Sequence, residues 1–365
     1  MNNRPKLIAF YLPQYHPIPE NDQWWGPGFT EWTNVTQAKP LFRGHIQPKI
    51  PRDLGFYDLR VPETRIAQAK LAKRAGIEGF CYWHYWFGDG RRLLERPFEE
   101  VLQSGQPDYP FCLGWANHTW FKKTWSANDK STILIEQKYP GESDIINHFN
   151  TMLPAFKDHR YMRIDNRLIF LIWDALHFKY GSSFFDKWNE LAKQNGLPNF
   201  YFIGFSYNKE YEKDILSKGF NAVCLDVMQE CYQTKSNIFK IFRKIRNLIG
   251  ITTPKVFNYN LYSNICIKIF DKSSNQLIPC VLPNWDHSPR SKQNAIIFKG
   301  CSPNKFISLL KKIVEIQQNK KSEINNVVFI KSWNEWGEGN YLEPDYENGT
   351  AYIDSLSSFI KQYTM

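Results

Sequence analysis

The sequence lacks the short motifs of common metal and redox sites. Its seven cysteines are scattered and odd in number, no CxxC pair occurs, and neither HExxH nor HxH is present among the eight histidines. These absences argue against a disulfide framework and a structural zinc site, and favour reduced, buried thiols. We therefore expect neither a metal nor another cofactor.

Nucleotide-binding signatures are missing as well. No GxGxxG or GxxxxGK[ST] follows the first apolar run, which argues against a dinucleotide fold and a P-loop. An Asp-x-Asp pair, usual in metal-dependent nucleotide-sugar transferases, is also absent. There is no apolar signal region, and no stretch reaches the roughly 18 apolar residues of a membrane span. We expect a cytoplasmic protein, with peripheral contact at the inner membrane as an alternative.

Positive charge is concentrated in one segment. The chain carries a formal charge of +10, and residues 232–273 hold eight Lys or Arg against one acid, a net +7. The rest is only mildly basic, so nucleic-acid binding is not expected. Residues 235–249 form a basic amphipathic pattern, which predicts a helix packed on the flank of the fold. Contact of this helix with an anionic membrane or a lipid-linked glycan is the alternative.

Apolar runs alternate with helical patterns along the whole chain. Strands are predicted at 7–12, 79–86, 110–118, 167–174, 200–205, 222–226, 278–286 and 327–330. Helices are predicted around 62–74, 92–104, 142–157, 182–195, 209–218, 303–317 and 350–363. Such alternation favours a closed (β/α)8 TIM barrel. We expect one domain over residues 1–365, with a long loop at 13–61 and a basic helical excursion at 230–275.

Two glutamates follow the last predicted strand. Residues 327–330 are a β-branched apolar run, and the loop after it carries Glu335 and Glu338, three residues apart. Gly337 and Gly339 favour a turn, in which this spacing puts both carboxylates on one face. A carboxyl buried among tryptophans keeps its proton more readily, as a general acid at neutral pH requires. The alternative is that one of them, or Glu343, only pairs with a Lys or Arg at the barrel mouth.

The ends of the other predicted strands are rich in polar and aromatic side chains. Aromatic residues make up 16% of the chain, and many of the 13 Trp lie in polar loops. Because barrel active sites are built at strand ends, these residues are candidates for binding the flat faces of sugar rings. The candidates are Tyr11, Gln14, Tyr15, His16, Glu31, Trp32, Trp83, His84, Tyr85, Trp115, Asn117, His118, Asp174, Tyr207, Asp226, Asn284, Trp285, Asp286, Asn334 and Trp336.

Two motifs resemble a known family. The segment 9–17 with Glu31-Trp32, and the run Trp333 to Gly339, are similar to the WbsX-like branch related to glycoside hydrolase family 99. The resemblance covers nearly the whole chain and implies a (β/α)8 barrel. Members of this branch occur among bacterial surface-polysaccharide biosynthesis proteins, of O-antigen or capsule, and are usually described as glycosyltransferases.

The resemblance also implies roles for the two glutamates. Glu335 takes the position of the carboxylate that deprotonates the sugar 2-hydroxyl, which attacks C1 and gives a 1,2-anhydro sugar. Glu338 takes the position of the general acid/base at the glycosidic oxygen, a substrate-assisted variant of retaining chemistry. Gly337 stands where the hydrolases commonly carry His. That departure affects the specificity of the site more than the roles of its carboxylates.

These observations leave three functions open. The favoured one is cleavage or transfer of a glycosidic bond in an oligosaccharide or polysaccharide, which could be lipid-linked. The second is a nucleotide-sugar-dependent glycosyltransferase of polysaccharide biosynthesis. The third is a non-catalytic glycan-binding barrel. The sugar, the linkage and the oligomeric state are left open.

Overall fold

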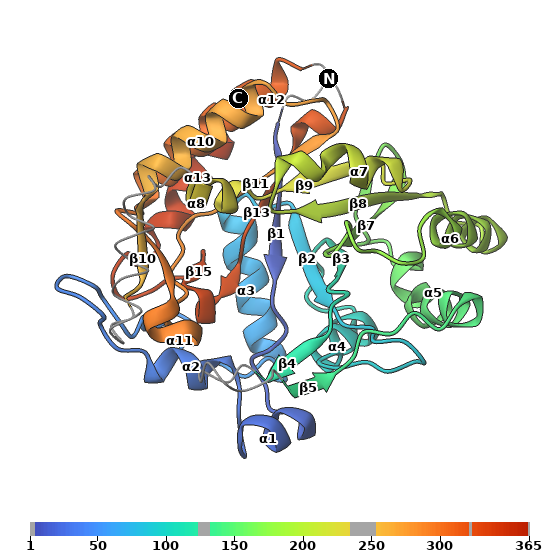
Figure 1. Ribbon diagram of the computed structural model, residues 1–365, viewed down its shortest axis with the longest axis horizontal. Helices are drawn as coiled ribbons and strands as arrows, with labels where there is room; N and C mark the ends of the chain where they lie inside the picture. Colours follow the sequence, from blue (N-terminus) through green and yellow to red (C-terminus); the bar gives the residue numbers. More distant parts are fainter. Residues whose placement is uncertain (1–3, 123–131, 234–252, 321–322, 364–365) are drawn as a thin grey trace.

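Eight parallel strands close into a barrel in the computed structural model, which describes residues 4–122, 132–233, 253–320 and 323–363 (Figure 1). Each pairs in parallel with its two neighbours, and pairing of β1 with β13 and of β3 with β7 closes the ring. The strands are β1 (Lys6–Tyr11), β2 (Gly79–His84), β3 (Phe111–Trp115), β7 (Arg167–Ile172), β8 (Phe200–Ser206), β9 (Ala222–Leu225), β11 (Leu277–Val281) and β13 (Val327–Ile330). The predicted (β/α)8 TIM barrel is confirmed.

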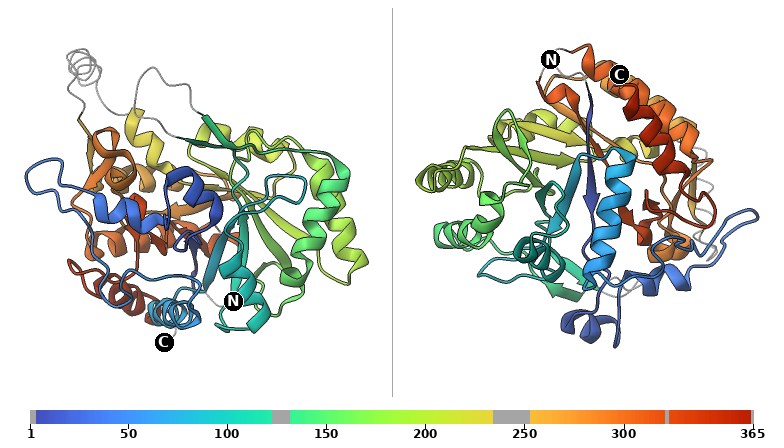
Figure 2. Two further views of the ribbon diagram at one scale, coloured as in Figure 1. Left: turned by 90° about the horizontal axis from the view of Figure 1, so that it is seen from below. Right: turned by 180° about the vertical axis from the view of Figure 1, so that it is seen from behind.

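A helix follows each barrel strand and packs on the outside of the ring (Figures 1 and 2). In chain order these are α3 (Pro62–Ala75), α4 (Arg96–Ser104), α5 (Glu142–Lys157), α6 (Ser182–Gln194), α7 (Glu212–Ser217), α10 (Tyr259–Asp271), α12 (Pro303–Gln318) and α13 (Ala351–Lys361). Helix α10 lies within the predicted excursion 230–275 and was not expected as a barrel helix.

The local sequence explains where these elements begin and end. Proline occupies the first turn of α3, α4 and α12, where its missing N–H costs nothing. Gly76 ends α3 in the left-handed conformation at φ 81°. A Cβ at that position would lie 2.8 Å from Ile360 of α13, so the same glycine lets α3 and α13 pack closely (Figure 2).

Shorter elements extend the loops at the carboxyl ends of the strands. Residues 13–61 carry α1 (Pro19–Trp25) and α2 (Glu31–Gln37), and α2 lies beside α11 (Ser288–Ser291) (Figure 1). Strands β4 (Trp120–Lys122) and β5 (Thr132–Ile135) pair with each other, as do β14 (Asn334–Glu335) and β15 (Asn340–Tyr341). The remaining elements are β6 (Arg163–Ile164), η1 (Lys209–Tyr211), η2 (Val227–Gln229), α8 (Glu230–Gln233), β10 (Lys255–Asn258), η3 (Lys292–Asn294), β12 (Ile296–Lys299), η4 (Glu323–Asn326) and η5 (Trp336–Glu338).

The basic segment lies largely outside the described residues. The helix predicted at 235–249 falls in the gap between residues 233 and 253, so that prediction remains open. Among the described residues, none of the helices has both the length and the apolar character needed to cross a membrane.

Candidate active site

The loop after β13 is fastened to the end of β1. The Tyr15 hydroxyl donates to the Asn334 carbonyl at 2.6 Å and accepts from the Trp336 amide at 2.9 Å. The Asn334 side chain accepts from the Leu12 amide at 2.7 Å and donates to the Leu12 carbonyl at 3.1 Å. Since Tyr15 and Asn334 are fully buried, these bonds fix the turn that presents Glu335 and Glu338.

Three carboxylates converge on the guanidinium of Arg290. Its Nε donates to Glu31 at 3.0 Å, one terminal nitrogen donates to Glu335 at 2.7 Å, and the other donates to Glu338 at 2.7 Å. Arg290 belongs to α11 after β11, Glu31 is the first residue of α2, and Glu338 ends the 3₁₀ turn η5. The turn expected from Gly337 and Gly339 is therefore present, and both glutamates face the same cation.

The surroundings separate the pKa values of the two glutamates. Burial raises the pKa of Glu335 from 4.5 to about 7; Arg290 opposes this shift, and the nearby carboxylate of Glu338 adds to it. Burial also acts against ionisation of Glu338, but Arg290 and His287, whose Nε2 lies 3.5 Å away, outweigh it and hold the pKa of Glu338 well below its usual range. In the free site, Glu335 is the carboxyl that holds a proton near neutral pH, the reverse of the assignment that the resemblance implies.

A second charged group lies beside this cluster. The Lys331 ammonium donates to the Tyr207 hydroxyl at 2.9 Å and to Asp226 at 3.2 Å, and it lies 4.8 Å from the ring centre of Trp285. Burial lowers the pKa of Lys331, but Tyr207 and Asp226 outweigh it and the pKa is raised. Lys331 was not predicted as a site residue, although three of its neighbours were.

Aromatic side chains pack behind the turn. The Trp336 ring stacks on Tyr341 at 3.8 Å and lies 5.6 Å from Trp32. Glu343, only 2% exposed, accepts from Trp336 and also from Gln68 and Tyr57. Within the described ranges no Lys or Arg forms an ion pair with Glu343, so the suggested salt-bridge role for Glu343 is wrong, whereas Glu335 and Glu338 do pair with Arg290. The hydrogen bonds assign Glu343 to the support of the turn.

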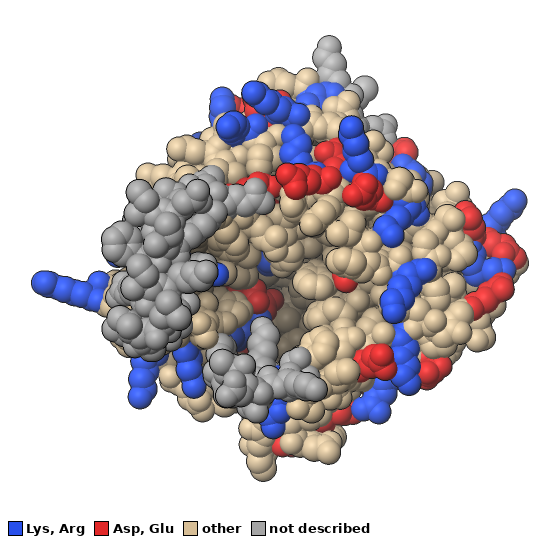
Figure 3. Space-filling view, viewed as in Figure 1, with Lys and Arg blue, Asp and Glu red and all other residues tan. Residues whose placement is uncertain are grey.

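The cluster is open to solvent on one side. Figure 3 shows a hollow at the centre of one face of the molecule, with acidic and basic side chains on its wall. Glu31 and Glu335 are 8% exposed in their side chains, whereas Glu338 and Arg290 are 19% and 21% exposed. A ligand therefore reaches Glu338 and Arg290 first.

The remaining predicted residues divide by the face of the strand from which they project. Gln14 donates to the Tyr85 hydroxyl at 2.8 Å, and the negative charge of Glu335 adds to the effect of burial in raising the pKa of Tyr85. Trp83 stacks on Phe10 inside the barrel. The side chains of Tyr11, His84 and Trp115 instead contact the surrounding helices, at Gln68 of α3, His148 of α5 and Phe184 of α6 respectively.

Several other candidates serve the scaffold. Asn117 bonds the backbone of Asp174 and so joins the ends of β3 and β7. His118 packs on Trp173 at 4.5 Å. His16 is 1% exposed, and burial lowers its pKa to about 4. None of these contacts places the side chain at the carboxylate cluster.

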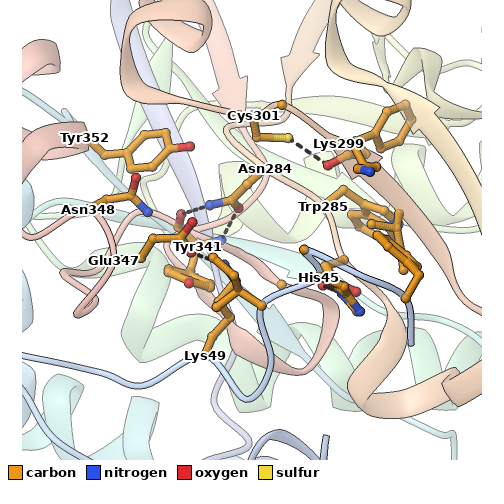
Figure 4. Close-up of a pocket in the computed structure, with 18 residues that line it drawn as sticks. His45, Lys49, Asn284, Trp285, Lys299, Cys301, Tyr341, Glu347, Asn348 and Tyr352 are labelled. Carbon is orange, nitrogen blue, oxygen red and sulfur yellow. Dashed lines mark hydrogen bonds and ion pairs between the residues drawn. The ribbon is translucent and has the colours of Figure 1, made fainter. Parts of the chain in front are cut away.

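Asn284, Trp285 and Asp286 line a separate cavity behind the turn, of about 160 Å³ (Figure 4). Asn284 bonds both the amide and the carbonyl of Tyr341, and Asp286 accepts from His45 and Gln47 at 2.7 Å each. The Asp286 amide also donates to the Glu338 carbonyl at 2.8 Å. These residues therefore hold the turn from its outer side.

Arg290, His287 and Lys331 are the site residues that the sequence did not reveal. They lie within the expected strand-end loops, but a single basic residue beside Ser and Pro carries no signal of its own. Their clearest trace in the sequence is position, since 287–290 follow a predicted strand. In the described part of the chain, no group of three or more His, Cys, Asp or Glu residues is suited to hold a metal ion.

Comparison with known proteins agrees with this architecture. The family described as "Glycosyltransferase WbsX" matches residues 7–356. Two proteins from strains of Xanthomonas campestris pv. campestris, each named "Uncharacterized protein WxcX", are 34% and 33% identical over 352 residues, which is 96% of this chain. That match covers 48% of each relative, so the chain spans about half their length.

Solved structures with the same fold include two carbohydrate-related proteins. The glycoside hydrolase family 99 endo-alpha-mannosidase from Bacteroides thetaiotaomicron, in complex with bis-tris-propane, has a TM-score of 0.58 at 13% identity, covering 100% of this chain and 98% of its own. A "glycoside hydrolase-like protein" has a TM-score of 0.58 at 15% identity, covering 98% and 94%. At these identities the likeness is one of fold.

Proposed function

This chain belongs to the WbsX glycosyltransferase family of carbohydrate-active proteins, and we propose that it cleaves or transfers a glycosidic bond with Glu335 and Glu338. The observation that carries the proposal is the convergence of these two carboxylates on Arg290, on a turn at the end of a barrel strand. Two carboxyl groups held in one site are the usual means of acid/base catalysis on a glycoside.

In the proposed reaction the sugar 2-hydroxyl is the nucleophile. Glu335 takes the hydroxyl proton, O2 bonds to C1, and the C1–leaving-oxygen bond breaks as that oxygen takes a proton from Glu338. In the second step an acceptor hydroxyl gives its proton to Glu338 and attacks C1, the C1–O2 bond breaks, and O2 regains its proton from Glu335. Two inversions at C1 retain the configuration.

The pKa values of the two glutamates affect both steps of the proposed reaction. A pKa of about 7 makes Glu335 a stronger base than an ordinary glutamate while leaving it partly ionised at neutral pH. The second step needs an ionised Glu338, which is its state in the free site. The first step needs a protonated Glu338, so the proton that Glu335 holds in the free site has to pass to Glu338 when the sugar binds.

The charge of the site favours a donor without a diphosphate. The two cations of the site pair with four carboxylates, Arg290 with Glu31, Glu335 and Glu338 and Lys331 with Asp226. Both cations are already bonded to carboxylates. Neither cation is therefore free to bind the diphosphate of a nucleotide. The family description names a glycosyltransferase, so a nucleotide-sugar-dependent transferase is the second candidate.

By family membership, we propose the glycans of bacterial surface polysaccharides, O-antigen or capsule, as substrates. The test incubates the full chain with such oligosaccharides and follows the products and their anomeric configuration by mass spectrometry and NMR. Glu335→Gln and Glu338→Gln should each lose roughly 10²–10⁴-fold in turnover. Glu63→Gln, an exposed carboxylate on α3, is the matched control.

Three outcomes separate the candidate functions. Full turnover in both site variants refutes the proposed roles. Thermal stabilisation by a nucleoside diphosphate, without stabilisation by glycans, supports the transferase. Glycan binding without turnover across the whole set supports a non-catalytic barrel.

A further inference from the structure

Arg290 is held at three points, and the partners are not equivalent. Glu31 binds the inner nitrogen, Nε, and its side chain is 8% exposed. Its own position is fixed because it opens α2 directly after Thr30, whose side chain forms a capping box with Thr33. Glu335 and Glu338 instead bind the two terminal nitrogens, one each. Glu31 therefore fixes the orientation of the guanidinium fork.

The ion pair of Glu31 and Arg290 occupies the space that a side chain at position 337 would need. A Cβ built on Gly337 would lie 2.3 Å from a carboxylate oxygen of Glu31 and 2.9 Å from Nε of Arg290. Both distances are far below van der Waals contact, so any side chain at 337 would have to displace the pair. The glycine and the ion pair thus depend on each other.

We infer that Glu31 and Arg290 are a positioning pair, in which Glu31 anchors the guanidinium and the guanidinium holds Glu335 and Glu338 together on one side of the turn. The inference rests on the proposed function only in so far as Glu335 and Glu338 are the reacting groups. Arg290 is well suited to this role, because its planar fork offers separate donors in fixed directions and lysine offers a single point charge.

The pair should also set the charge of the two glutamates, together with the other groups that face them. Glu338 faces Arg290, His287, Lys331, Glu335, Asp226 and Tyr207. The groups around Glu335 are Arg290, Glu338, Glu31, Tyr15 and Tyr85. Arg290 is the cation common to both sets, so its removal should make both glutamates harder to ionise.

The test titrates the glutamates without any substrate. The full chain is labelled with ¹³C at the glutamate carboxyl carbon, the resonances of Glu335 and Glu338 are assigned with Glu335→Gln and Glu338→Gln, and their midpoints are followed by NMR. Arg290→Gln should raise the Glu338 midpoint by roughly 1–3 pH units. Arg290→Lys, which keeps the positive charge, should leave the Glu338 midpoint much closer to its wild-type value than Arg290→Gln does. Glu31→Gln should lower the Glu335 midpoint, because Arg290 is then shared by fewer carboxylates.

The control is Arg160→Gln. Arg160 is a buried arginine that pairs with Asp158 at 2.6 Å and donates to the Val101 and Pro107 carbonyls. Its carbonyl accepts from the amide of Phe111, the first residue of β3, so it lies at the amino ends of the strands, opposite the site. This variant should lose stability and leave both midpoints unchanged. If Arg290→Gln does not fold, the shift of the Glu335 midpoint in Glu31→Gln still decides the matter.

Unchanged midpoints in Arg290→Gln and Glu31→Gln, or the same shift in Arg160→Gln, would overturn the inference. The expected shifts support it whether or not a glycan is turned over. Expected shifts together with undiminished turnover in Glu335→Gln and Glu338→Gln would count against the proposed function and leave the positioning pair standing.

Discussion

Replacing Glu343 by glutamine should remove a large pH dependence of stability. Glu343 is 2% exposed and accepts hydrogen bonds from three neutral donors, the indole N–H of Trp336 at 2.7 Å, the Gln68 amide at 2.7 Å and the Tyr57 hydroxyl at 2.9 Å. Burial raises its pKa from 4.5 to about 7, against the effect of these donors. The ionised form of Glu343 therefore destabilises the folded protein relative to the protonated form.

The sign and size follow from linkage. Below pH 4.5 the carboxyl is protonated in both the folded and unfolded chain, and stability falls as the pH rises from there to about 7. A shift of this size, at 1.36 kcal/mol per pH unit, corresponds to about 3 kcal/mol. Glutamine carries no charge at any pH. Its mismatched amide N–H costs about 1 kcal/mol, but by the same amount throughout.

The assay is urea unfolding followed by far-UV circular dichroism at several values between about pH 4.5 and pH 8. The unfolding free energy of Glu343→Gln minus that of the wild type should rise by about 3 kcal/mol across this window. Glu63→Gln, exposed on α3, controls for the change in net charge. A difference that stays constant with pH would refute the reasoning.

Three further predictions concern the site. If Glu335 is the base and Glu338 the acid, the pair must hold one proton, so kcat/KM on an accepted glycan should fall as the pH rises through about 7, where that proton is lost; a rate that rises or stays flat between pH 6 and 8 would contradict this. Lys331→Met leaves the carboxylate of Asp226 buried without its cation and should cost about 3–5 kcal/mol in urea unfolding, most of which the double variant with Asp226→Leu should regain. Gly337→Ala should lower the unfolding free energy by about 1–3 kcal/mol through its clash with Glu31; no loss would contradict the contact.

The barrel could be predicted from the sequence because its strands are buried on both faces. A run such as Arg167–Ile172, with Asn166 before it and Asp174 shortly after it, has few alternatives to a central parallel strand. The short pairs β4–β5, β10–β12 and β14–β15 were not predicted, since two to four residues carry no recognisable period. Helix α10 was missed because its sequence was assigned to the basic excursion.

The site was predictable only in part, for a geometric reason. Side chains alternate between the two faces of a strand, so a strand-end position does not by itself say which way a residue points. Phe10 and Trp83 stack inside the barrel, while their neighbours Tyr11 and His84 turn outward to the helices. A shift of one residue in the strand register would exchange these roles.

Gly337 links the sequence to the chemistry of the site. The resemblance to glycoside hydrolase family 99 implies a histidine at this position, and the sequence departs from it. The structure explains why glycine is found there, because the contact between Glu31 and Arg290 occupies the volume that a side chain at position 337 would need. A relative with a side chain at this position cannot keep the same ion pair in the same place. It must therefore set the charge of its two glutamates in another way, so residues 31, 290 and 337 should vary together among proteins that share this fold.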